Sequence, residues 1–249
     1  MLRLRSGPLA AWATAWLTGQ VGSDDVLRAA MTGDAPHQVS GLDGADGELA
    51  PLSEALILWR RAGGLVRVVL PVAGDVRGLP GPAAFRSAAI EAGEAVCGGG
   101  IGLVPEVTEF GPSSALPTVL WQAFPLDPAP PDYLAVSDAQ YELTTAIRDC
   151  AAALTAGDVA GTRDDIADAL RDARRAGERL NLPPGHPSRA VALLAQAERL
   201  QAVLELAAAD PVGGAIDRHG IAVRTSALTP LATPVRRARM ASYNAGAGE

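Results

Sequence analysis

The residues best suited to binding chemistry lie in one glycine-rich loop. Ala73 to Gly81 follows a β-branched run and precedes a helix pattern that starts with Pro82. Backbone N–H groups at such a helix start bind phosphate or carboxylate groups, and the guanidinium of Arg77 would add a bidentate contact to the same anion. We therefore predict a small-anion site that uses five residues of this loop: Gly74, Asp75, Arg77, Gly78 and Gly81.

The same loop also has a purely structural interpretation. Its glycine spacing matches neither the dinucleotide-binding fingerprint nor a phosphate loop. In this interpretation the glycines allow the chain to turn, and Asp75 accepts hydrogen bonds from neighbouring backbone amides. Both interpretations stay open at the level of sequence.

Three arginines near the C-terminus form a second candidate contact. Arg236, Arg237 and Arg239 fall on a short predicted helix that begins at Pro234, with Thr233 as its N-cap. Such a group could contact a partner protein or nucleic acid. Compensation of the helix dipole explains the same charges equally well. Nucleic acid is not favoured as a partner, because the chain as a whole carries a net charge of −7.

Other reactive residues follow no catalytic or metal-binding pattern. The three histidines, His37, His186 and His219, fall on predicted loops without a second ligand at metal spacing. The serines within residues 111–115 precede a strand pattern, whereas a nucleophile elbow precedes a helix. We predict no catalytic residue, metal or cofactor, although a catalytic site assembled from distant residues stays open.

A cluster of acidic residues in the second half could in principle hold a metal. Asp164 and Asp168 lie one helical turn apart, as do Asp165 and Asp168. Arginines follow on the same predicted helix, so a solvated, salt-bridged surface is the favoured interpretation.

The chain contains no lysine, because all 21 of its basic side chains are arginine. Schiff-base and pyridoxal phosphate chemistry need a lysine amine, and guanidinium groups stay protonated. Walker-loop NTPases and protein kinases need the lysine charge beside their phosphates. These enzyme classes are therefore excluded, and the bias itself is typical of a GC-rich bacterial genome.

The sequence also predicts the redox state and the compartment. Cys97 and Cys150 follow no metal or redox spacing, so we expect buried, reduced thiols. The apolar run Pro8 to Leu17 is read as an amphipathic helix, since it is short and lacks a clear signal-peptide cleavage site. No stretch reaches the length of a membrane span, and we expect a cytoplasmic protein.

Residues 1–132 are expected to form a mixed α/β region. A small three-stranded mixed sheet would be covered by helices, with its first two strands parallel if they are neighbours and the third antiparallel. The expected helices are 8–18, 24–31, 51–62 and 82–96, and the expected strands are 65–72, 101–107 and 118–125. Gly98 to Gly100 is interpreted as a helix stop.

Residues 133–249, after the proline-rich segment 127–132, are expected to be helical. Helices at about 137–157, 159–181 and 187–209 would pack as an antiparallel bundle, followed by the short basic helix. The fold class is thus α+β. The missing catalytic pattern and the long, charged helical bundle favour a non-catalytic adaptor or regulator that acts through a protein partner or self-association. The alternative is an enzyme or sensor that binds a small anion at residues 73–82.

Overall fold

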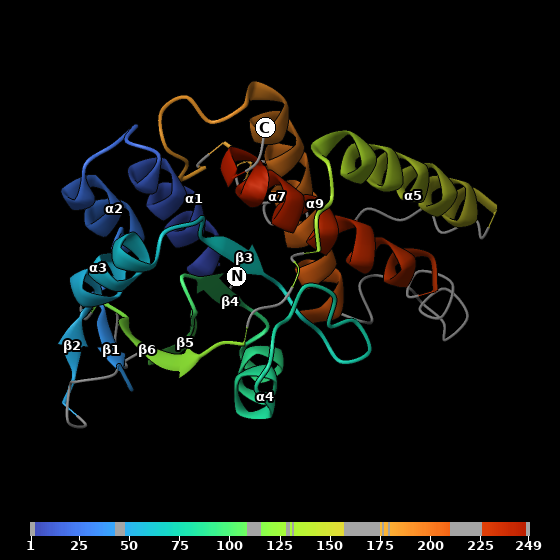
Figure 1. Cartoon of the computed structure of the whole chain (residues 1–249). Coiled ribbons are helices and arrows are strands. Elements are labelled where there is room, and N and C mark those ends of the chain that lie inside the picture. The colour runs from blue at the N-terminus through green and yellow to red at the C-terminus, as the bar shows by residue number, and fades with distance from the viewer. Residues whose placement is uncertain are drawn as a thin grey trace. The chain divides into compact units, whose positions relative to one another are not determined.

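The chain forms two units, one built on a sheet and one made of helices (Figure 1). The computed structural model describes residues 3–42, 48–108, 116–127, 130, 132–156, 175, 177–178, 180–209 and 226–247. The sheet unit comprises Leu2–Tyr133, Asn181–His186 and Tyr243–Glu249, and the helical unit comprises Leu134–Leu180 and Pro187–Ser242.

The sheet has six strands in the order β2-β1-β6-β5-β4-β3. Strands β1 and β6 pair in parallel, and all other neighbours pair antiparallel. The α+β class is therefore confirmed, whereas the expected three-stranded sheet is wrong. The strands are β1 Gln38–Ser40, β2 Ala50–Pro51, β3 Arg67–Val69, β4 Ala95–Gly98, β5 Ile101–Thr108 and β6 Thr118–Pro125.

Strand β4 lies where the sequence predicted the end of a helix. Helix α4, Ala83–Ala92, stops at Gly93, which adopts a left-handed conformation with φ +73°. The chain then forms β4 and turns directly into β5 through Gly99 and Gly100, whose φ values are +54° and +78°. Two consecutive positive φ angles are what a tight two-residue hairpin requires. Gly98 to Gly100 is thus a hairpin turn rather than a helix stop.

The position of β4 also changes the predicted pairing. It lies between β3 and β5 and is antiparallel to both, so these two strands are not neighbours. The antiparallel return of β6 against β5 is confirmed. Strands β1 and β2 were missed because three and two residues are too few to show an alternating pattern.

Helices cover both faces of the sheet. Figure 1 shows α1, Ser6–Leu17, α2, Ser23–Ala30, and α3, Leu52–Ala62, on one side and α4 on the other. Phe85 of α4 packs with Val69, Ala95 and Val104 in one apolar cluster. Because side chains alternate between the faces of a strand, Val68 and Val96 then lie on the opposite face.

Helix α1 is more deeply buried than the sequence suggested. We expected an amphipathic helix, but only Trp12 and Leu17 are partly exposed and every other residue is buried. The helix packs against α2, β3 and β4, so neighbours surround it. Its alanine-rich sequence permits this close approach, because small side chains leave room for neighbouring backbones.

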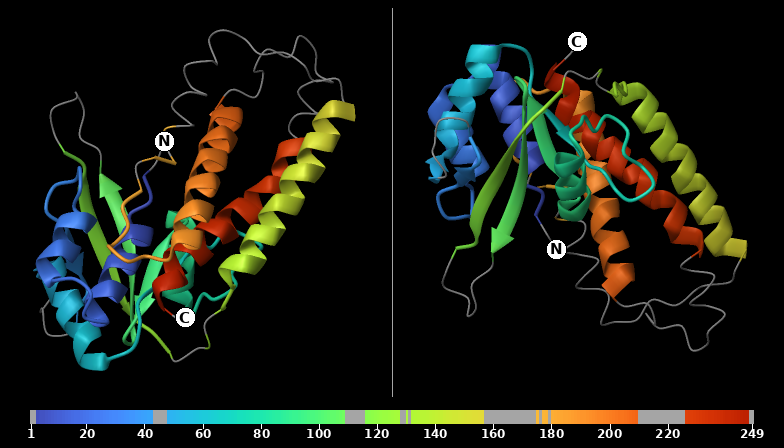
Figure 2. Two further views of the ribbon diagram at one scale, coloured as in Figure 1. Left: turned by 90° about the horizontal axis from the view of Figure 1, so that it is seen from above. Right: turned by 60° about the horizontal axis from the view of Figure 1, so that its bottom comes forward.

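The helical unit contains α5, Val136–Ala156, α7, Ser188–Ala209, and most of α9, Ala232–Asn244. Helix α9 runs antiparallel to α5 and α7 (Figure 2). Cys150, Ala227 and Leu231 form a buried apolar cluster with partly buried residues such as Leu204. The expected helix at 159–181 lies almost entirely outside the described residues, so the bundle remains a prediction. No helix in the described ranges is long and apolar enough to cross a membrane.

Candidate functional site

The loop that the sequence singled out begins with a closed turn. Val72 and Asp75 exchange two backbone hydrogen bonds. The N–H of Val72 donates to the carbonyl of Asp75 at 3.1 Å, and the N–H of Asp75 donates to the carbonyl of Val72 at 2.9 Å. Gly74 makes this turn possible because its φ is +86°, which side chains rarely permit. Three residues of the predicted anion site thus shape the backbone, since Gly78 has a φ of +70° and Gly81 precedes a cis peptide bond to Pro82.

Arg77, the predicted anion ligand, is already bound to a carboxylate. Its Nε and Nη2 atoms each donate to Asp75 at 2.7 Å, one bond to each carboxylate oxygen. About half of the Arg77 side chain stays exposed. A ligand carboxylate or phosphate would therefore have to displace Asp75 from the guanidinium fork.

The helix that should supply backbone donors also begins farther along the chain from the preceding strand than expected. Strand β3 ends at Val69, and α4 begins only at Ala83 with Pro82 as its N-cap residue. In phosphate sites a strand typically leads through a short loop directly into a helix N-terminus. Here the strand does not lead directly into the helix. The loop geometry favours the structural interpretation of its glycines, and the anion site stays a prediction.

The same loop presents apolar side chains to solvent. Val72 is 40% exposed and Val76 is 46% exposed, while Leu79 is buried in the cluster around Phe85. Tyr133 is 59% exposed and follows Asp132 in the chain, and Asp132 packs on the loop, since a Cβ on Gly78 would stand 2.9 Å from Cβ of Asp132. We call Val72, Val76 and Tyr133 the valine-loop surface.

Two of the C-terminal arginines have partners inside the helical unit. Nε of Arg237 donates to Glu142 of α5 at 3.0 Å, and Nε of Arg239 donates to Glu198 of α7 at 2.9 Å. The Arg237 and Arg239 side chains are about nine-tenths buried. This placement favours a structural role for them, as links between α9 and its neighbours. Arg236, on the same helix, is partly buried.

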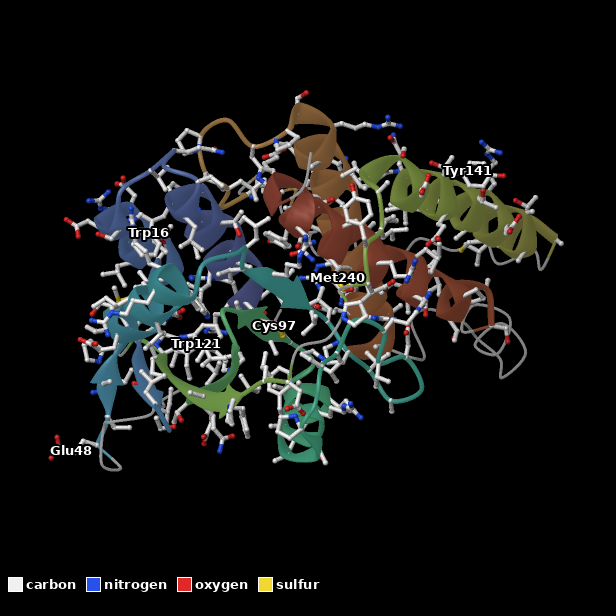
Figure 3. All side chains as sticks on the ribbon, in the orientation of Figure 1. Trp16, Glu48, Cys97, Trp121, Tyr141 and Met240 are labelled. Carbon is white, nitrogen blue, oxygen red and sulfur yellow. The ribbon has the colours of Figure 1, made fainter. Side chains whose placement is uncertain are left out.

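A buried polar network that the sequence analysis missed lies inside the sheet unit. The Arg5 guanidinium donates to both carboxylate oxygens of Asp34, at 3.2 and 3.1 Å. His37 Nε2 lies 3.4 Å from Oδ2 of Asp34. On the other side of the ring, Trp121 Nε1 donates to His37 Nδ1 at 3.1 Å. Figure 3 labels Trp121 within the sheet unit.

The network determines the protonation of His37. Because Nδ1 accepts a hydrogen bond, the proton of the neutral ring belongs on Nε2, facing Asp34. Burial lowers the pKa of His37, while the Asp34 carboxylate acts in the opposite direction. The His37 side chain is fully buried, so it has no surface to offer a substrate. The network joins α1, the segment after α2 and β6.

A second buried carboxylate holds the start of α1. Glu94 accepts hydrogen bonds from the backbone N–H groups of Arg5 and Ser6, at 2.9 and 2.8 Å, and from the Ser6 hydroxyl. Burial raises the pKa of Glu94, and these donors lower it in part. Glu94 thus serves as an N-cap supplied from nearly ninety residues along the chain. No local sequence signal could have revealed either carboxylate.

The remaining candidates give a mixed result. Cys97 is partly buried and Cys150 is buried, both as free thiols, and burial raises the pKa of Cys97 to about 12. His186 belongs to the sheet unit through residues 181–186. Within the described residues, no cluster of His, Cys, Asp or Glu has the form of a metal site. The reactive residues considered and not favoured as sites, namely His219, the serines within 111–115, Asp164, Asp165 and Asp168, lie outside the described residues.

Both halves of the chain match domains of one protein family. Residues 6–135 match the N-terminal domain of the Rv1486c-like proteins, and residues 137–240 match their C-terminal domain. Uncharacterized protein Rv1486c of Mycobacterium tuberculosis (strain ATCC 25618 / H37Rv) is 33% identical over 95% of each chain. Uncharacterized protein ML1804 of Mycobacterium leprae is 29% identical over 95% of each chain. No solved structure matches. The chain therefore belongs to the Rv1486c-like protein family and spans both of its domains.

Proposed function

We propose that the protein is a non-catalytic adaptor or regulator that binds a partner protein through the valine-loop surface. The observation that carries this proposal is the exposure of Val72, Val76 and Tyr133 on neighbouring segments. Contiguous exposed apolar surface is typical of interaction sites, and tyrosine is enriched among the residues that dominate binding energy.

The rigidity of the loop supports the same role. The Val72 to Asp75 turn is closed by two backbone hydrogen bonds, Arg77 is held by Asp75, and Leu79 anchors the loop in the core. A surface that is already ordered loses little conformational entropy when a partner binds. The exposed valines are thus presented on a fixed backbone, as a preorganised binding surface requires.

Replacing both valines by serine tests the proposal. We expect V72S/V76S to fold like wild type, because the two side chains are exposed, but to lose at least tenfold of its affinity for the partner that wild type captures from its host cells. The matched control is Leu116→Ser, which changes an exposed apolar residue next to β6. Equal capture by wild type and V72S/V76S would contradict the proposal.

A second candidate is a sensor or enzyme that binds a small anion at the same loop. The observation in its favour is that Arg77 is half-exposed and holds a carboxylate in bidentate geometry, as it would hold a ligand. A thermal-shift screen of nucleotides and of phosphorylated or carboxylated metabolites tests it. A ligand that stabilises wild type and not Arg77→Ala supports this candidate, and hits insensitive to the substitution remove it.

A further inference from the structure

One oxygen of the buried Asp34 carboxylate is shared by three donors. Oδ2 lies 3.2 Å from Nε of Arg5, 3.4 Å from Nη2 of Arg3 and 3.4 Å from Nε2 of His37. A carboxylate oxygen has two lone pairs, so three donors cannot all bond to it at full strength. The two 3.4 Å distances exceed that of a well-formed hydrogen bond, as sharing of the oxygen would produce.

Two of the three donors are held firmly. The Arg5 side chain is buried, its guanidinium also donates to Oδ1 of Asp34 at 3.1 Å, and its backbone N–H donates to Glu94 at 2.9 Å. The His37 side chain is fully buried between Asp34 and β6. Neither residue can leave the carboxylate without disturbing the packing of the sheet unit.

Arg3 is held less firmly. Its side chain is 40% exposed, and its other hydrogen bond goes to the carbonyl of Thr32 in the segment after α2. The guanidinium also lies against Gly33, where an added Cβ would stand 2.9 Å from Nη1. Because a partly exposed ion pair contributes little free energy, Arg3 can exchange Asp34 for water at small cost.

A proton on His37 would change the balance between these donors. In the neutral ring Nδ1 accepts from Nε1 of Trp121, so the added proton must go to this nitrogen. The indole nitrogen can only donate, and its bond to the ring would break. The charged ring would bond Asp34 more strongly through Nε2, because charge-assisted hydrogen bonds are shorter and stronger. A third positive charge would then stand beside one buried carboxylate, which is costly where water is excluded.

We propose that Arg3 and protonated His37 compete for Oδ2 of Asp34, so that mild acid releases the chain before α1 from the segment after α2. Arg3 moves into water, and the release ends at Arg5, which keeps its bonds to Asp34 and Glu94. Arg3, Asp34 and His37 thus form an acid-released latch.

The surroundings of His37 set the pH at which the latch opens. Burial lowers the pKa of His37 from its ordinary 6.5, Asp34 raises it in part, and the charges of Arg5 and Arg3 lower it again. The neutral ring therefore predominates above pH 6.5, and the latch opens as the pH falls below this value.

NMR of the full chain follows both ends of the latch in one titration from about pH 7.5 to about pH 5. We expect the indole N–H resonance of Trp121 and the Cζ resonance of Arg3 to shift with the same midpoint, below pH 6.5, because one proton causes both changes. In His37→Gln neither resonance should titrate. The latch would be overturned if Trp121 titrates while Arg3 stays unchanged, or if neither titrates while the protein is folded.

Thermodynamic linkage gives a second test that changes only a partly exposed side chain. If protonation of His37 releases Arg3, removal of Arg3 must ease the protonation. We expect Arg3→Gln to raise the midpoint read at Trp121 by roughly half a pH unit, the size typical of a partly exposed charge. Arg28→Gln is the matched control and should leave the midpoint in place, since Arg28 is exposed and paired with Asp25. No rise in Arg3→Gln, or an equal rise in Arg28→Gln, would contradict the competition.

Discussion

At the scale of residues, the buried network around Asp34 is the feature that sequence alone could not predict. Arg5 and Asp34 are 29 residues apart, and His37 and Trp121 are 84 apart. In the sequence His37 was a single loop histidine without a partner. Only the pairing of β1 with β6 brings it to Trp121, and that pairing depends on a strand too short to leave a pattern.

His37 makes the stability of the sheet unit depend on pH. Because burial lowers its pKa below the ordinary 6.5, the unfolded chain binds a proton at this residue before the folded protein does. The contribution of His37 to stability is therefore constant above pH 6.5 and is lost as the pH falls below it, by at most about 1.4 kcal/mol per pH unit. Urea melts at a series of pH values from about 5 to about 7.5 measure this loss.

His37→Gln provides the comparison, since glutamine does not titrate. The stability difference between wild type and His37→Gln should shrink as the pH falls, because only wild type loses the histidine contribution. All other groups, including Glu94, cancel in this difference. Two stability curves that stay parallel throughout the range would contradict a neutral, buried His37.

At the scale of elements, the helices were predictable and the short strands were not. The expected helices at 24–31 and 51–62 match α2 and α3 closely, because their apolar spacing is regular and Gly63 ends α3. Strands β1, β2 and β4 have two to four residues and leave no such pattern. The glycine-rich turn before β5 fits a helix stop and a hairpin equally well until β4 is seen beside it.

Gly100 tests the hairpin. Its φ of +78° is unfavourable for alanine, although no atom lies within 4 Å of an added Cβ. Gly100→Ala should therefore destabilise the sheet unit by about 1–2 kcal/mol. Gly100→Asn should cost clearly less, since asparagine accepts left-handed conformations in such turns. Equal losses for the two variants in urea melts would argue against the turn.

At the scale of the whole molecule, the sheet unit includes two segments from the second half of the sequence. Residues 181–186 and 243–249 belong to it, and each contains one of the two asparagines of the chain. Asn181 donates to the carbonyl of Ala29 at 2.7 Å and accepts from Trp12 Nε1 at 2.9 Å. No local sequence pattern reveals the role of these asparagines, because their partners lie far along the chain.

Asn181→Ala should destabilise the sheet unit even though the sequence places residue 181 at the end of an expected bundle helix. The change leaves the partly buried Trp12 N–H without its acceptor, which costs about 1–3 kcal/mol. Tryptophan fluorescence reports on this unit alone, because all four tryptophans lie before residue 133. Asn181→Asp keeps the acceptor and should lose less. A fluorescence midpoint unchanged in Asn181→Ala would argue against this attachment.

The proposed partner contact is tested most directly by a photo-crosslinking amino acid at position 76 of the full chain in its host cells. The same probe at position 116, also exposed and apolar, is the control. The valine-loop surface predicts one discrete crosslinked protein from position 76, absent from position 116 and reduced when Val72→Ser is added. The absence of any crosslink specific to position 76 would contradict a partner bound at this surface.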